Sequence, residues 1–330
     1  MEVPPEISRL DLVASNKEKP VQLFRWTQEE ALQAFPPILY PHLPYSNPLY
    51  NRMKAPHNTP PRHCLFAATF PPGTTAMLEI YTLIFADRSR HEESQIWTFN
   101  SLNTTTEPLS ASQQTTLTAH VEATVDFLKG VSIPEAPGWP FSPILKFACQ
   151  HGHWRTSILE IGEARDAVPR QTHWNQWLVK TSTISSLPAA SKAQPEEYIV
   201  TRVPDNQLDI VISTSSIPRQ PSTYKMLPSV GIMNTEGKLA AWAYVGIDGS
   251  IATLYVLPDF RGKGLSSIIA RELLARLERG EFADLGYDGK SGWVHADVYD
   301  GNAGSEAVMR GLGGTIWWKS SYIWIDSARF

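Results

Sequence analysis

The sequence has little cysteine and little charge, and each shortage excludes a class of protein. Only Cys64 and Cys149 occur among 330 residues, so neither a disulfide framework nor a cysteine-rich zinc site is expected. Charged residues make up 19%, below the usual ~25%, which argues against long disordered tails and coiled coils. No run approaches the ~18 apolar residues of a membrane span, and a net charge of -4 lacks the basic excess of a nucleic-acid binder. We therefore expect neither a membrane nor a nucleic acid as partner.

The first residues lack the features of a targeting leader. Met1–Leu10 contains no apolar core, and the acidic Glu2 and Glu6 argue against a mitochondrial presequence. A reducing, cytoplasmic location is the expectation. The sequence leaves open whether the protein is a monomer or a homodimer.

Length and proline usage predict two domains. Apolar residues make up 42% of a chain longer than a single core usually supports. Most of the 26 prolines lie before residue 230, so the first half should contain short elements and long connections. Residues 187–197 are small, polar and bounded by prolines, which is typical of a linker. The predicted domains are therefore residues 1–186 and 198–330.

The second domain carries the clearest periodic pattern. Two strands, Leu239–Val245 and Ile251–Val256, flank Asp248-Gly249, which is typical of a two-residue hairpin turn. Apolar residues at helical spacing predict a helix over Gly264–Arg279. The later predicted elements are a strand at Trp293–Tyr299, a helix at Ala303–Gly311, and a closing hairpin formed by Thr315–Trp318 and Tyr322–Ile325.

A glycine-containing loop opens the predicted helix. Its residues are Arg261, Gly262, Lys263, Gly264, Leu265 and Ser266. Glycines let a ligand approach the backbone, the helix start offers unpaired N–H groups, and the two cations add positive charge. The loop is thus a candidate pyrophosphate cradle, although a plain glycine-rich turn with two solvated cations explains the same residues. The spacing fits neither a P-loop nor a dinucleotide fingerprint.

Three segments from residue 231 onward resemble the GNAT superfamily of acyltransferases. Val256–Ser266 is similar to its acyl-CoA signature, with Ser266 in place of the final Gly or Ala. Val298–Asn302 resembles the strand-to-helix step that carries an Asn, here Asn302, and Gly311–Gly314 resembles the end of the following helix. The resemblance implies that acyl-CoA binds along Val256 and Leu257 and at the loop. One backbone N–H near Val256 or Leu257 would polarise the thioester.

A narrower resemblance is to the glycine N-acyltransferase branch, and it extends into the first half. The matching segments are Pro41–Ser46, Leu227–Ser229, Gly237–Trp242 and Leu257–Arg261. It implies an α/β chain of two GNAT-like halves, each a mixed, mostly antiparallel sheet flanked by helices, with no CoA loop in the first half. His173–Leu178 is also similar to Trp317–Trp324, either as an internal repeat or through the chance likeness of Trp-rich strands.

The acid–base residues that the resemblance would supply are absent. Ser250 stands where that branch has its Glu, and Met309 stands where the superfamily has a Tyr acid. His295, Asp297 and Asp248 are the replacement candidates. His295 and Asp297 share one strand face and rank first, since a turn residue such as Asp248 usually faces water. A structural histidine and a plain turn aspartate are the competing interpretations.

The implied reaction is transfer of an acyl group, most simply acetyl, from CoA to the amine of a small molecule. No cysteine has a nucleophile signature, so direct transfer within a ternary complex is preferred. His151 and His153 lack a third ligand, and no metal is expected. A catalytically degenerate GNAT-fold binding module, or the same fold used for another reaction, remains the alternative.

Overall fold

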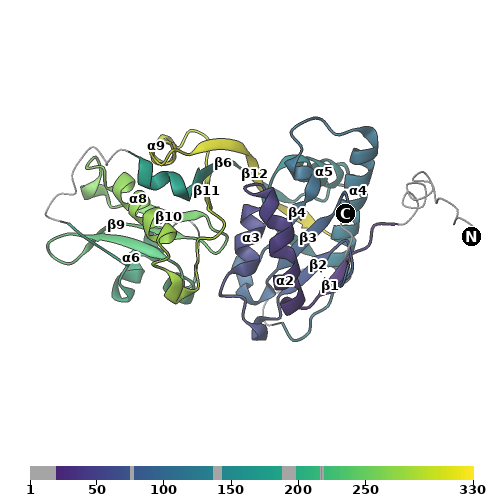
Figure 1. Ribbon diagram of the computed structural model, residues 1–330, viewed down its shortest axis with the longest axis horizontal. Coiled ribbons are helices and arrows are strands. Elements are labelled where there is room, and N and C mark those ends of the chain that lie inside the picture. Colours follow the sequence, from purple (N-terminus) through teal and green to yellow (C-terminus); the bar gives the residue numbers. More distant parts are fainter. Residues whose placement is uncertain (1–19, 75–77, 137–142, 188–197, 216, 218) are drawn as a thin grey trace, which may run out of the picture.

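The computed structural model describes residues 20–74, 78–136, 143–187, 198–215, 217 and 219–330, which form two α/β halves (Figure 1). The elements of the first half are β1 (Phe24–Trp26), α2 (Gln28–Leu39), α3 (Asn47–Lys54), β2 (Leu65–Ala68), β3 (Thr82–Ala86), β4 (Ile96–Asn100), α4 (Ala111–Gly130), β5 (Ile144–Gln150), α5 (Gly152–Ala164) and β6 (Arg170–Lys180). Short 3-10 turns connect several of these elements. The predicted linker lies, apart from Leu187, outside the described residues.

The second half repeats the same order of helices and strands. Its elements are β7 (Ile199–Thr201), α6 (Leu208–Thr214), α7 (Pro221–Lys225), β8 (Ser229–Met233), β9 (Leu239–Val245), β10 (Ile251–Val256), α8 (Leu265–Glu278), β11 (Trp293–Val298), α9 (Ala303–Gly311) and β12 (Thr315–Asp326). Both halves therefore read strand, two helices, three strands, helix, strand, helix, strand. The predicted α/β class and the two similar halves are confirmed.

The halves exchange their last strands. One sheet has eight strands in the order β1-β2-β3-β4-β5-β12-β6-β11, and the other is an antiparallel sheet in the order β10-β9-β8-β7. The last strand of the second half, β12, thus pairs with β5 of the first, while β6 of the first pairs with β11 of the second. Figure 1 shows β12 running from the second half into the first. The larger sheet consequently belongs to both halves.

The two segments with similar sequence lie side by side. β6 and β12 pair antiparallel, with Trp177 opposite Ile316 and Trp174 opposite Ser320. Each segment is the tenth and last element of its half. Their shared tryptophan-rich pattern thus falls on the same position in two repeats of one topology.

The predicted closing hairpin is wrong, because Thr315–Asp326 is one strand of 12 residues. The segment Lys319-Ser320-Ser321 contains no Gly, Asn or Asp to supply a tight turn. Both serines are fully buried yet hydrogen-bonded: Ser320 Oγ donates to Asp297 Oδ1 (2.7 Å), and Ser321 Oγ accepts from Arg155 Nε (2.6 Å). The strand therefore continues through polar residues that a turn would have exposed.

The turn at Asp248-Gly249 also differs from the prediction. Five residues connect β9 to β10, and the Gly246 N–H donates to the Ser250 carbonyl (2.7 Å). Gly249 has φ +78°, as a turn glycine should. Asp248, however, is only 8% exposed, so this turn faces the interior rather than water.

A continuous apolar core fixes α8 on the smaller sheet. Buried side chains at helical spacing along α8, including Ile269, Leu273 and Leu277, pack in one cluster with Trp242 of β9. Burial of each such side chain contributes roughly 2 kcal/mol. The start of α8 is therefore held beside the end of β10. Among the described helices, none is long and apolar enough to cross a membrane.

Candidate functional site

The amino-terminal end of α8 is open to a ligand. Gly262 and Gly264 have φ of +74° and +79°, a conformation that side-chain-bearing residues rarely adopt. Gly264 is the N-cap, and no side chain of the described residues caps this end. The first helical bonds run from the N–H groups of Ser267 and Ile268 to the Gly264 carbonyl. The amides before them point out of the helix, where an anion can accept from them.

The two cationic side chains of the loop, Arg261 and Lys263, contact residues that flank it. Arg261 Nε donates to the Val256 carbonyl (3.1 Å), and its guanidinium lies 5.6 Å from the centre of the Tyr255 ring. Lys263 Nζ donates to the Tyr198 hydroxyl (3.4 Å). Both cations are therefore held next to the exposed loop, where they add to the positive end of the helix dipole.

The equivalent helix of the first half is closed. The Gln113 N–H donates to Ser110 Oγ (3.3 Å) at the start of α4, and the Ser110 N–H donates to Gln113 Oε1 (3.0 Å). This capping box satisfies amides that remain open at α8. The two halves thus differ at the place where a phosphate would bind.

β10 is irregular just before the loop. Its pairing with β9 shifts register between Ala252 and Tyr255, and Thr253 between them has φ +52°. This is a β-bulge, which leaves residues outside the ladder. The Leu257 N–H, in contrast, donates to the Ala240 carbonyl (3.0 Å), so that amide is engaged in the sheet.

β10 and β11 part from each other beside this bulge. They are edge strands of different sheets, joined by a parallel bridge between Ser250 and His295. The His295 N–H also lies within hydrogen-bond distance of the Gly249 carbonyl (3.4 Å). Past the bridge the two strands follow separate sheets. The turn, the bulge and the first residues of β11 therefore meet at one point.

Three of the predicted catalytic residues meet at this point. His295 is fully buried, and its Nε2 lies 3.5 Å from Asp248 Oδ2, an ion-pair distance without hydrogen-bond geometry. Ser250 Oγ donates to Asp248 Oδ1 (2.7 Å). Asp248 was expected to face water, and burial beside His295 corrects that expectation.

The charges of this pair shift both pKa values. Burial alone would lower the pKa of His295, but the Asp248 carboxylate and, less strongly, Asp297 raise it above the usual value. Burial alone would raise the pKa of Asp248, but His295 and the Ser250 donors bring it far below the usual range. The Asp248 carboxylate therefore stabilises the protonated form of His295.

Asp297 lies on the same strand face as His295 but in its own hydrogen-bond network. Its Oδ1 accepts from Gln176 Nε2 (3.0 Å) and from Ser320 Oγ (2.7 Å), and its Oδ2 accepts from the Tyr322 hydroxyl (3.1 Å). Three donors thus fix the position of the carboxylate. The donors come from β6 and β12, the two exchanged strands.

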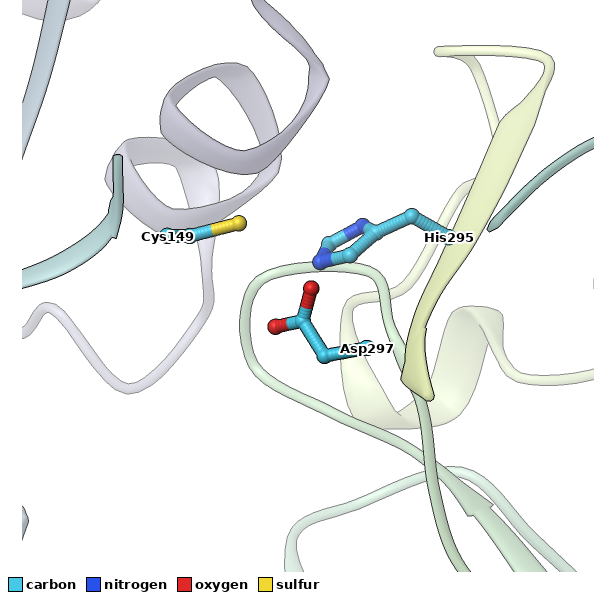
Figure 2. Close-up of side chains that lie close together, drawn as sticks. All are labelled: Cys149, His295 and Asp297. Carbon is cyan, nitrogen blue, oxygen red and sulfur yellow. The ribbon is translucent and has the colours of Figure 1, made fainter. Parts of the chain in front are cut away.

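Cys149 of the first half also reaches this cluster. The cysteine sulfur, the nearest imidazole nitrogen and the nearest Asp297 oxygen all lie within 4.8 Å of one another. Figure 2 shows the tip of the His295 ring facing both the Asp297 carboxylate and the sulfur. Cys149 has φ +54° where β5 gives way to α5. Burial, with Asp297 and Asp248, raises the pKa of the Cys149 thiol well above its usual value.

The remaining predicted positions have defined surroundings. Asn302 is the N-cap of α9, and its Oδ1 accepts from the Ser305 N–H (3.1 Å). Leu265 is buried and Ser266 is half-buried at the start of α8. Met309, which stands at the family's acid position, is 2% exposed and belongs to the apolar core.

Sequence reasoning missed the contributions of Cys149, Gln176 and Tyr322. The available signals were polar: two serines inside an apolar strand, and a glutamine between two tryptophans. A buried polar side chain needs a partner, so such residues mark places where a strand faces a polar cluster.

Two family models match successive segments of the chain. Residues 21–221 match the family model described as acyl-CoA N-acyltransferase verG N-terminal domain. That segment is more than half of the 330 residues. The chain belongs to this acyl-CoA N-acyltransferase verG N-terminal domain family. Residues 229–323 match the model described as FR47-like protein, and together the two matches confirm the resemblance to GNAT acyltransferases. No curated protein matches the sequence significantly.

Solved structures support the fold of this family member. A Drosophila protein solved by a structural genomics consortium aligns over 93% of this chain and 99% of its own, with a TM-score of 0.64 at 14% identity. A tandem GNAT protein from the clavulanic acid biosynthesis pathway covers 93% and 98% of the two chains, at a TM-score of 0.45 and 12% identity. A glucosamine N-acetyltransferase region of a fungal multi-domain GH3 β-N-acetylglucosaminidase covers 93% and 38%, at a TM-score of 0.48 and 10% identity. The last two scores are too low to support more than a general likeness.

Proposed function

We propose that the protein is an acyl-CoA-dependent N-acyltransferase that transfers an acyl group, most simply acetyl, to the amine of a small molecule. The observation that carries the proposal is the open end of α8, with Gly262 and Gly264 in the left-handed conformation and two cations alongside. Such an end can receive the pyrophosphate of CoA. The capped start of α4 supports a single CoA site per chain.

We assign cofactor binding to residues 198–330 and the acceptor site to residues 1–186. The later segment holds acyl-CoA at the loop, with Val256 and Leu257 along the pantetheine and Asn302 at the start of the next helix. The earlier segment supplies the surface that shapes the acceptor site. The shared sheet supports this arrangement, because β6 brings first-half residues next to β11. We also place the protein in a reducing cytoplasm, in keeping with a sequence that contains only two cysteines.

The acyl transfer follows from the irregular strand. A thioester bound beside β10 would place its carbonyl oxygen near the bulge at Thr253. The residues of this bulge are not paired in the regular β-ladder, so a backbone N–H there could polarise the carbonyl. The neutral acceptor amine attacks the carbonyl carbon and forms the C–N bond. The C–S bond then breaks, and CoA leaves as the thiolate. The nitrogen loses one proton and the thiolate gains one, so an amide and free CoA result.

His295 is our proposed proton acceptor, with Asp248 as its positioning residue. The imidazole lies where β10 and β11 separate, and its Nε2 is at ion-pair distance from the Asp248 carboxylate. Asp297 already accepts three hydrogen bonds, which favours a supporting role. Ser250 holds Asp248 and takes no proton itself. A water chain would connect the buried imidazole with the acceptor.

A ligand-induced thermal shift tests the cofactor assignment. Acetyl-CoA at a hundredfold excess over its dissociation constant should stabilise the wild type by about 2–3 kcal/mol. Gly264→Asp should abolish this shift, because it inserts a negative side chain where phosphate must bind. Gly130→Asp, at the exposed end of α4 where a new side chain meets open space, is the matched control and should keep the shift. A wild type that responds to no acyl-CoA would refute the assignment.

The alternative function is a GNAT-fold module that binds acyl-CoA without turnover. Met309 in the apolar core and Ser250 at the place of the family's Glu favour it. Thiol release from acetyl-CoA, measured with a panel of amines, separates the two functions. Binding without thiol release for every amine would support the module.

A further inference from the structure

The cluster of Cys149, His295 and Asp297 has the composition of a metal site. A thiol, an imidazole and a carboxylate are three ligand types that zinc accepts. Their donor atoms lie within 4.8 Å of one another, and they come from β5 of one half and β11 of the other. We propose that these three side chains bind one divalent transition-metal ion, with zinc as the best match, and so join the two halves of the chain.

The His295 imidazole supplies a buried nitrogen that already faces acidic groups. His295 is fully buried, and its Nε2 lies 3.5 Å from Asp248 Oδ2, at an ion-pair distance without hydrogen-bond geometry. A metal ion at this nitrogen would supply the positive charge that faces the carboxylates. Figure 2 shows the same end of the ring facing the sulfur and the carboxylate.

The surrounding hydrogen bonds orient the three ligands. Gln176 Nε2 lies 2.7 Å from the Cys149 sulfur and 3.0 Å from Asp297 Oδ1. Asn47 Nδ2 lies 3.4 Å from His295 Nδ1, the nitrogen that faces away from the cluster. With a metal at Nε2 the proton is on Nδ1, so the Asn47 amide has to turn its oxygen toward this nitrogen when an ion binds. Metal sites rely on outer contacts to fix ligand orientation, and the Gln176 contacts are already in place.

The distances and charges are compatible with a tetrahedral ion. Bonds of 2.0–2.3 Å place neighbouring donors about 3.3–3.6 Å apart, so this cluster would contract by roughly 1 Å on binding. The Asp248 carboxylate, 3.5 Å from His295 Nε2, adds negative charge beside the site. Three protein ligands leave one position for water. The mixed thiolate, imidazole and carboxylate set suits zinc, and cobalt can replace zinc as a coloured probe.

No local sequence pattern predicts this site. Its donors lie far apart along the chain, and the expectation of no metal came from the short His151–His153 pair. Neither residue of that pair is one of the three proposed ligands. The exchange of β6 and β12 aligns β5 and β11 on either side, and this brings Cys149 of the first half to His295 of the second.

The test measures binding to the full chain, stripped with a chelator and kept reduced. One equivalent of Co²⁺ should give the visible bands of a tetrahedral site and a thiolate-to-cobalt charge-transfer band. Zn²⁺ should displace the colour and raise the melting temperature. Cys149→Ser should remove the charge-transfer band and weaken zinc binding at least 100-fold, while Asp297→Asn should weaken it about 10–100-fold. Cys64→Ser is the matched control and should behave as the wild type.

Two results would overturn the proposal. One is a wild type that gives no charge-transfer band with Co²⁺ and no thermal response to Zn²⁺. The other is a band that survives in Cys149→Ser or disappears in Cys64→Ser. Circular dichroism confirms that each variant folds, and His295→Gln provides a second ligand variant if Cys149→Ser does not. A metal on His295 Nε2 would occupy the nitrogen assigned above to proton transfer, so the metal site and the His295 base are alternative roles of one residue. The readout here is binding, so its outcome does not depend on acyl transfer.

Discussion

At the scale of single residues, His295 is the centre of the polar cluster. It is buried, it faces Asp248 across the β10–β11 bridge, and it shares a strand face with Asp297. Removing one member of a buried charged pair leaves the other without compensation, at a cost of about 3–5 kcal/mol. Burial alone would lower the pKa of the imidazole, but the Asp248 carboxylate raises it, and this shift should be visible in the pH dependence of the rate.

The pH–rate profile of acyl transfer tests the assigned base. A base works in its neutral form, and the pKa of His295 is raised above 6.5, so the rate should rise with pH through a value above 6.5. His295→Gln should lower turnover about 10²–10⁴-fold and remove this limb, with acetyl-CoA affinity nearly unchanged.

Asp259→Asn, at an exposed aspartate before the loop, serves as the control for that experiment. The limb should persist in this variant. If the rise of the rate with pH follows only the pKa of the acceptor amine and is unchanged in His295→Gln, then His295 is not the base. Catalysis would then come from positioning of the substrates and from polarisation of the thioester by a backbone N–H.

The residues of the site could be predicted only in part. His295, Asp297 and Asp248 were identified because titratable residues near a strand end are visible in the sequence. Their partners were not, because Cys149 and Gln176 reach the cluster through contacts between distant strands. The inward direction of Asp248 also depends on packing against the first half and not on its own turn sequence.

At the scale of elements, β12 serves both halves at once. Its early residues pair with β6 beside the second half, and its later residues pair with β5 inside the first. Ile323 of this strand is fully buried in the first-half core, whereas Ile316 is 48% exposed. One strand thus offers a buried and an exposed isoleucine for comparison.

Replacing these isoleucines should separate burial from strand propensity. Ile323→Ala should lower the free energy of unfolding by about 2–5 kcal/mol, because it opens a cavity beside Phe147. Ile316→Ala should change it by less than about 0.5 kcal/mol. Chemical denaturation gives both values. Similar losses of unfolding free energy in the two variants would contradict the burial of Ile323 and the exposure of Ile316.

The elements from Leu239 to Gly311 were predicted well, because each carries a local pattern. β9, β10 and α9 begin and end at the expected residues, and α8 is one residue shorter at each end. The hairpin failed because strand alternation continues through Lys319–Ser321 and no turn residue interrupts it. No local pattern states which sheet a strand joins, so the exchange itself could not be predicted.

At the scale of the whole molecule, two buried histidines should make the fold sensitive to acid. Burial lowers the pKa of His120 and of His151 to about 4, so both stay neutral in the fold while the unfolded chain protonates near 6.5. Each depressed pKa therefore costs stability as pH falls from about 6.5 to 4, on the order of 3 kcal/mol in full. His295 acts in the opposite sense, because its pKa is raised.

Equilibrium unfolding between pH 7 and pH 4 measures this loss. His120→Gln should reduce the pH dependence by about one proton, because glutamine keeps a polar partner for Thr82 without titrating. A wild type whose stability is flat from pH 6.5 to 4 would contradict the buried, neutral state of both histidines.

The strand exchange has a consequence for biosynthesis. β5 ends at Gln150, but its neighbour β12 begins only at Thr315. At about 5–20 residues per second, a ribosome makes the intervening chain in roughly 10–30 s. Through that interval the nascent first half carries an unpaired strand edge of the kind that seeds aggregation. Translation speed and chaperone access over those residues should therefore govern how much of this protein reaches its native form.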